Sequence, residues 1–120
     1  MPEIKDKKYG KTLFFIEDNE IKDKKYGTTL FYIDGSEIKE KSKYGTVKFY
    51  IDGNEIKEKS KYGTVRYYVD SSEVKEKSKY GSLRYFIDGS EIKDKKYGNV
   101  KYYIDSALTK DQLYGFLSII

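Results

Sequence analysis

The residue types that most often carry catalysis or bind metals are missing from this chain of 120 residues. It contains no histidine and no cysteine, so it lacks the commonest general base, the commonest metal ligand and any disulfide framework. Acid–base chemistry would depend on aspartate, glutamate, lysine or tyrosine, and the sequence has no nucleophile paired with a base and no phosphate-binding loop. We therefore expect a protein that is not an enzyme and holds no cofactor or metal ion.

The chemistry that the chain does repeat is a cation followed two positions later by an aromatic residue. Side chains alternate across a β-strand, so both members of such a pair are expected on one face. Tyrosine and arginine are enriched at the energetic centres of protein interfaces, which favours a partner-binding surface. The alternative is a solvated face on which lysine and arginine stems pack against neighbouring rings. The predicted partner-binding residues are Lys48, Tyr50, Arg66, Tyr68, Arg84, Phe86, Lys101 and Tyr103.

The same surface is also suited to nucleic acid, because single-strand binders combine stacking rings with positive charge. The net charge of +4 points the same way. Glutamates such as Glu37, Glu40, Glu55 and Glu58 nevertheless recur on the intervening segments, and their field opposes a polyanion. Nucleic acid is therefore the weaker alternative at this stage.

A Tyr-Gly pair preceded by lysine recurs six times, at spacings of 17 or 18 residues. Each unit joins an aromatic segment such as TVKFYID (46–52) to a charged one such as EIKEKSK (37–43), with turn residues between them. The pattern predicts an all-β fold, an antiparallel meander of six tandem hairpins over residues 3–105 that forms one twisted or curled sheet in a single domain, 1–120. In a competing parallel solenoid, equivalent lysines would stack about 4.8 Å apart. Their mutual repulsion would disfavour that arrangement, so we expect the meander. The sequence leaves open whether the sheet closes into a barrel.

The turn residues have simple structural interpretations. Repeated aspartates such as Asp34 and Asp52 could suggest calcium, but each precedes glycine or serine, which is ordinary turn chemistry. In the Tyr-Gly pairs, glycine is expected to supply a positive φ and tyrosine to pack along the edge of the sheet.

The aromatic segments present one apolar face, predicted to be the core, with Val47, Phe49 and Ile51 as its members in the third unit. In the first two units Leu13 and Leu30 replace the cation on the opposite face, so both faces are apolar there. We therefore expect another part of the molecule to cover this end.

The tail, residues 107–120, is the candidate cover. Thr109 and Gln112 have the spacing of a capping box, which predicts a helix from about Lys110. Its apolar face is expected to cover the end of the sheet, the first two hairpins or a second copy of the chain. The predicted capping or self-association residues are Leu13, Leu30, Leu113, Phe116, Leu117 and Ile120.

The units KYGTVKFYIDGNEIKEKS (43–60) and KYGTVRYYVDSSEVKEKS (61–78) resemble MORN-type repeats, in particular the bacterial variants found in antitoxin-like proteins. The shared part is an aromatic strand YGxVxxY, an acidic or glycine turn and a charged return strand, and it covers about residues 3–105. The resemblance implies a twisted sheet of successive hairpins that is used for binding. The lysine, glutamate and tyrosine ladders also look like the single-layer sheet of spirochaete outer-surface lipoproteins.

The leading hypothesis is a small cytoplasmic protein that occludes the surface of another protein, as an antitoxin, an immunity protein or a phage-encoded inhibitor does. The second is a structural protein that self-assembles as a homo-oligomer through sheet edges or the C-terminal helix. The third is a nucleic-acid binder. No membrane partner is expected, because the chain has no apolar run suited to a membrane span or a signal peptide.

Overall fold

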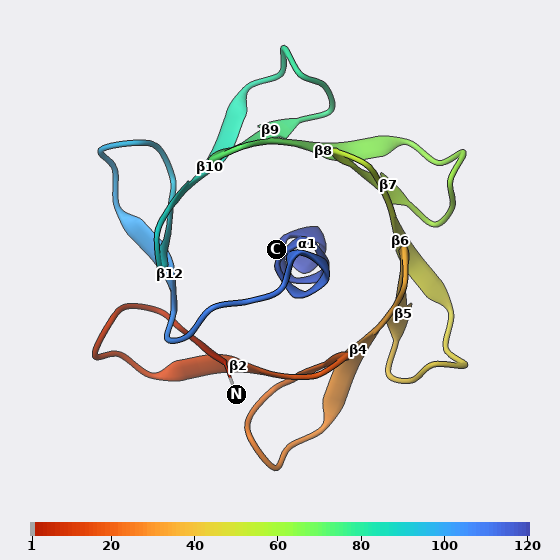
Figure 1. Ribbon diagram of the computed structural model, residues 1–120, viewed down its shortest axis with the longest axis horizontal. Coiled ribbons are helices and arrows are strands. Elements are labelled where there is room, and N and C mark those ends of the chain that lie inside the picture. Colours follow the sequence, from red (N-terminus) through yellow and green to blue (C-terminus); the bar gives the residue numbers. More distant parts are fainter. Residues whose placement is uncertain (1) are drawn as a thin grey trace.

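The computed structural model describes residues 2–120 as a closed barrel of twelve antiparallel strands with one helix inside it (Figure 1). The strands are β1 (Glu3–Lys5), β2 (Thr12–Glu17), β3 (Glu20–Lys22), β4 (Thr29–Asp34), β5 (Glu37–Glu40), β6 (Val47–Asp52), β7 (Glu55–Glu58), β8 (Val65–Asp70), β9 (Glu73–Glu76), β10 (Leu83–Asp88), β11 (Glu91–Lys93) and β12 (Val100–Ile104), and the helix is α1 (Lys110–Ile119). Strands that follow each other in the chain are neighbours in the sheet. The predicted meander of hairpins is confirmed, whereas the twisted or curled sheet is corrected to a closed barrel because the two ends of the meander pair.

The seam between β1 and β12 closes the barrel. Ile4 pairs with Ile104. The Glu3 backbone N–H donates to an Asp105 carboxylate oxygen at 2.7 Å, and the Asp105 N–H donates to the Glu3 carbonyl at 3.1 Å. Within residues 2–120 every strand therefore has a neighbour on both sides. The edge pairing that the sequence suggested for self-assembly has no open edge in this part of the chain.

Tight turns join each aromatic strand to the charged strand that follows. Asp34 pairs with Glu37 across a two-residue turn that begins with Gly35. Gly35 has a φ of +59°, in the left-handed region that glycine adopts without strain. Asp18 and Ser71 occupy this region at the equivalent turns, with φ of 53° and 57°. The repeated aspartates thus lie where the turn interpretation expects them.

Helix α1 fills the interior of the barrel (Figure 1). The Thr109 hydroxyl accepts a hydrogen bond from the Gln112 N–H at 3.1 Å, and the Gln112 side chain accepts one from the Thr109 N–H at 3.0 Å, which confirms the predicted capping box. A barrel of about eight strands is filled by its own side chains, whereas twelve strands enclose a wider space. The helix occupies that space. No helix in the described part of the chain is long and apolar enough to cross a membrane.

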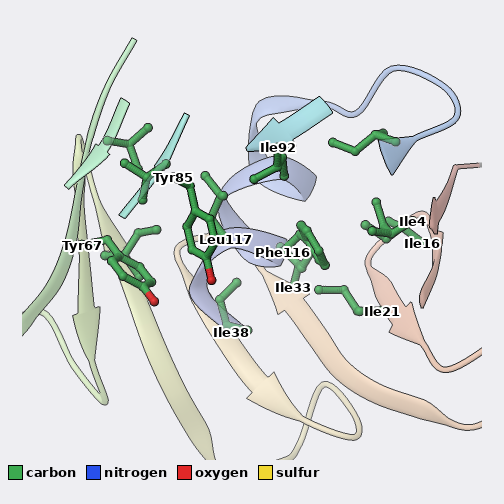
Figure 2. Close-up of a cluster of buried hydrophobic side chains, with 14 residues drawn as sticks. Ile4, Ile16, Ile21, Ile33, Ile38, Tyr67, Tyr85, Ile92, Phe116 and Leu117 are labelled. Atoms are coloured by element: carbon green, nitrogen blue, oxygen red, sulfur yellow. The ribbon is translucent and has the colours of Figure 1, made fainter. Parts of the chain in front are cut away.

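The core forms between this helix and the inner side of the strands (Figure 2). Phe116 is fully buried and makes edge contacts with Phe14 and Tyr102, at ring-centroid distances of 5.5 Å and 5.3 Å. A Cβ at Gly115 would lie 2.8 Å from the Ile33 side chain, so the glycine allows α1 to approach β4. The predicted capping residues Leu113, Phe116, Leu117 and Ile120 all pack in this core. The helix therefore covers the inside of the barrel, where it packs on strands of the first two hairpins, and of the predicted covers the one over the end of the sheet is wrong.

Candidate binding surfaces

A β-bulge near the start of every aromatic strand divides the predicted strip of cations and aromatics. In β6, Phe49 pairs with Ile38 but Val47 pairs with Lys39, so Lys48 is an extra residue between them. The same shift occurs in all six units, and the extra residues are Leu13, Leu30, Lys48, Arg66, Arg84 and Lys101. The strict alternation behind the predicted strip is thereby broken. Val47, which was predicted in the core, lies outside the core cluster for the same reason.

The cations of β8 and β10 lie against rings that belong to the core. The Arg66 guanidinium carbon lies 5.0 Å from the centroid of the Tyr67 ring and 5.5 Å from that of Phe49. The Arg84 guanidinium carbon lies 5.4 Å from the centroid of the Tyr85 ring. These contacts join the cations to inward-facing aromatics, so the structure does not bring them together with Tyr68 and Phe86 as one strip.

The aromatic members of the predicted strip belong to the wall of the barrel. Tyr50 is half-buried and pairs with Lys57 on one side and Glu37 on the other. The Lys57 ammonium lies 2.9 Å from Asp52 and 3.6 Å from Glu55, and the hydrogen bond to Asp52 raises the pKa of Lys57. Equivalent lysines with two carboxylates are Lys22, Lys39, Lys75 and Lys93, and Tyr68, Phe86 and Tyr103 are the other wall aromatics of the strip. This environment fits the alternative of cross-strand packing.

The most exposed aromatic side chains are the six tyrosines of the Tyr-Gly loops. Tyr9, Tyr26, Tyr44, Tyr62, Tyr80 and Tyr97 are 89–92% exposed. Their loops project outward from the barrel all around its circumference (Figure 1). We call this surface the rim, and it comprises residues 6–11, 23–28, 41–46, 59–64, 77–82 and 94–99. The prediction that these tyrosines pack along the sheet edge is wrong.

Glycine follows each tyrosine because the backbone passes too close to another group for a side chain. A Cβ at Gly45 would overlap the Glu40 carbonyl oxygen, and one at Gly27 would overlap the Asp23 carboxylate. Neither glycine has a positive φ, so that prediction is also wrong. The left-handed residue in the longer loops is a lysine instead, as at Lys41 with φ of 64°.

The rim gathers positive charge that the sequence interleaves with negative charge. Its six loops contain 13 lysines and three aspartates, whereas the whole chain has a net charge of only +4. The rest of the chain is therefore net negative. In three loops a lysine lies over the tyrosine, with 5.6 Å from the Lys8 ammonium to the Tyr9 ring centroid and 5.5 Å from Lys25 to Tyr26. The third such pair is Lys96 and Tyr97, at 5.6 Å. Positive charge and exposed ring are thus presented together.

Hydrogen bonds from the wall and within the loops hold the rim in place. The Lys39 ammonium donates to the Lys43 carbonyl and to Asp34, both at 2.8 Å. In the shorter loops Asp23 accepts from the Thr28 N–H at 2.9 Å. A groove of about 440 Å³ beside the second loop is lined by Phe15, Glu17, Lys22, Lys25, Tyr26 and Gly27. The rim is therefore a set of formed loops with aromatic and basic side chains at their surface.

Sequence reasoning missed the rim as a site, although a signal was visible. The tyrosine of each of the six Lys-Tyr-Gly triplets lies outside the strand segments, where no core face requires an aromatic residue. Within residues 2–120, no three acidic side chains come together as ligands of a metal ion would.

Comparison of the chain with protein-family models, with curated proteins and with solved structures found no match. The resemblance to MORN-type repeats therefore stays a prediction.

Proposed function

We propose that the protein is a non-catalytic binding protein that holds single-stranded nucleic acid along its rim. The observation that carries this proposal is the combination of six tyrosines, each 89–92% exposed, with the 13 lysines of the same loops. Single-strand binders combine a positively charged path for phosphates with aromatic side chains on which bases stack. Every loop of the rim offers both.

The radial arrangement of the loops suits a flexible polymer. The loops point outward around the circumference, so a single strand can bend around the ring and meet them in turn (Figure 1). The molecule measures 39 × 37 × 17 Å, so this path is a narrow band around a disc. Lysine is also depleted in protein interfaces, while phosphates favour it.

The glutamates that oppose a polyanion in the sequence are divided between two places: Glu37 and Glu55 begin their strands, away from the rim, whereas Glu40 and Glu58 directly precede it. Glu37 and Glu55 belong to the wall, 3.6 Å from the ammonium groups of Lys39 and Lys57. Because each of these two glutamates is paired with a lysine, their negative field is weaker at a distance. Salt in the solution screens the remaining field. The loop lysines therefore meet less opposing charge than the interleaved sequence suggests.

A protein partner is the second candidate, and the exposure of the tyrosines supports it. Tyrosine is a typical anchor of protein interfaces. One or two loops that enter an acidic groove would be enough to occlude that groove, as an antitoxin, immunity or inhibitor protein does. A protein partner of this kind would contact only part of the rim, whereas a bound nucleic-acid strand would contact many loops at once.

Fluorescence anisotropy with a labelled oligothymidylate tests the proposal. Replacing Tyr9, Tyr26 and Tyr97 together by alanine is expected to weaken binding by tenfold or more, because each stacked base contributes about 1–3 kcal/mol. The matched control is Tyr50→Ala in the wall, which is expected to bind like the wild type once thermal melting shows that it is folded.

Absence of binding at low salt, or an equal loss of affinity in Tyr50→Ala, would contradict the nucleic-acid proposal. A pull-down from a nuclease-treated lysate separates the second candidate. A stoichiometric protein that is captured by the wild type and lost with the triple rim variant would favour the protein partner instead.

A further inference from the structure

Independently of the rim, we infer that the barrel opening beside Arg84 and Lys101 binds a small organic anion with an aromatic or apolar body. A cavity of about 410 Å³ there is lined by Leu13, Arg84, Tyr85, Asp94, Lys101 and Tyr102. Its volume is in the usual range for small-molecule sites, about 300–1,000 Å³. It lies at the end of the barrel where β10 and β12 begin, just after their Tyr-Gly loops.

The cations of this cavity lack the carboxylate partners that the wall lysines have. Five wall lysines each contact two carboxylates, as Lys57 does with Asp52 and Glu55. Among residues 2–120, neither Arg84 nor Lys101 forms an ion pair. The β-bulges explain the difference, because they make these two cations the extra residues of their strands. An anion that enters the cavity would therefore meet two positive charges and the one negative charge of Asp94.

The one acid of the cavity is already engaged. Asp94 accepts a hydrogen bond from the Asn99 N–H at 2.9 Å and so helps to shape its own loop. A second cavity of about 330 Å³ on the other side of Arg84 contains Arg66 and Lys77 but also Glu58 and Glu76. Its mixed charges make it less suited to an anion than the larger cavity.

Aromatic rings form the other half of the proposed site. The Tyr85 and Tyr102 rings pack edge to face with centroids 6.5 Å apart, and Tyr85 packs in the same way on Tyr67 at 6.4 Å. The phenol oxygens of Tyr67 and Tyr85 point toward the same end of the barrel (Figure 2). Arg84 lies 5.4 Å over the Tyr85 ring, which limits the positions open to its guanidinium group. The cavity thus offers aromatic surface beside fixed positive charge.

The position of the cavity in the ring accounts for its two kinds of lining. The extra residue of the bulge is leucine in the first two units and a cation in the last four. Because β12 pairs with β1, Lys101 of the last unit and Leu13 of the first come together across the seam. The cavity therefore joins an apolar side to a cationic side, which is the lining that an amphipathic anion requires.

Two polar groups of the cavity have the charge states that such a ligand needs. Burial, followed by Tyr85 and Tyr67, raises the pKa of Tyr102. At neutral pH Arg84 is charged and Tyr102 is a neutral hydrogen-bond donor.

Titration of the full chain with 8-anilinonaphthalene-1-sulfonate tests the inference, because this probe combines a fused aromatic body with an anionic group. Saturable fluorescence with one site per chain is expected. Arg84→Gln is expected to lower the affinity about tenfold, as for the loss of one hydrogen bond to a charged group. The matched control is Lys110→Gln, which removes an exposed cation at the start of α1 and is expected to leave the affinity unchanged.

A second comparison keeps the test decisive if Arg84→Gln fails to fold. The wild-type protein is expected to bind the sulfonate probe about tenfold more tightly than the uncharged N-phenylnaphthylamine of similar shape. Equal affinity for the two probes, no saturable binding, or an equal loss in the Lys110→Gln control would overturn the inference. Because no rim residue is changed, failure here leaves the proposal for the rim untouched.

Discussion

Replacing Phe116 by alanine tests whether the helix holds the barrel together from within. Phe116 is fully buried, and its ring packs edge to face on Phe14 and Tyr102. Removing a buried phenylalanine lowers the free energy of unfolding by about 3–5 kcal/mol, and two aromatic pairs place the expected loss at the upper end of that range. A domain of this size has a total stability of about 5–15 kcal/mol, so the variant is expected to fold but to be much less stable.

Urea unfolding followed by circular dichroism measures the effect. With a urea dependence of about 1–3 kcal/mol per molar, the midpoint is expected to fall by roughly 2 M. The matched control is Tyr97→Ala, which removes an aromatic ring that is 89% exposed and is expected to change stability by less than about 0.5 kcal/mol. A midpoint within roughly 0.5 M of the wild type in the Phe116 variant would show that the helix does not fill the barrel.

Three further measurements test other parts of the structure. Replacing Lys95 and Lys96 by glutamine is expected to reduce the slope of log K against log salt for oligothymidylate by about 1.4, because each phosphate contact contributes about 0.7. Thr109→Ala removes the helix cap and is expected to lower the free energy of unfolding by about 1 kcal/mol, measured in urea. The hydrogen bond from Lys39 lowers the pKa of Asp34 from its ordinary 3.8, so this stabilisation is present above that pH and is lost as the pH falls through the lowered value. Lys39→Met is therefore expected to show a smaller fall in Tm than the wild type between about pH 5 and 2.

The strands and the helix could be predicted from the sequence because their signals are local. Aromatic and β-branched residues between turn residues gave the aromatic strands, and Asp-Gly pairs gave the turns. Thr109 and Gln112 are three residues apart, and their capping box forms as expected. Each of these features depends only on residues that are close together in the sequence, so a short segment is enough to predict it.

Closure of the barrel could not be predicted because it depends on the sum of six units. Each hairpin adds a small rotation, and the first and last strands meet only if the total completes a circle. The bulges were missed for a related reason. Lys48 is an extra residue in its strand, between the partners of Ile38 and Lys39, and nothing in the sequence marks it as extra. The bulge nevertheless removes Lys48 from the alternation on which the predicted strip depended.

The fold separates charges that alternate along the sequence. Along the chain, lysines and glutamates alternate too closely to suggest a basic surface. In the fold, the first glutamate of five charged strands is held beside a wall lysine, as Glu55 is beside Lys57 at 3.6 Å, while the loops carry most of the remaining lysines outward. A repeat of 17 or 18 residues adds one basic loop per hairpin, and closure arranges six of them around one ring. Mixed charge in the sequence is therefore compatible with a strongly basic rim, and a polyanion is a chemically consistent partner for it.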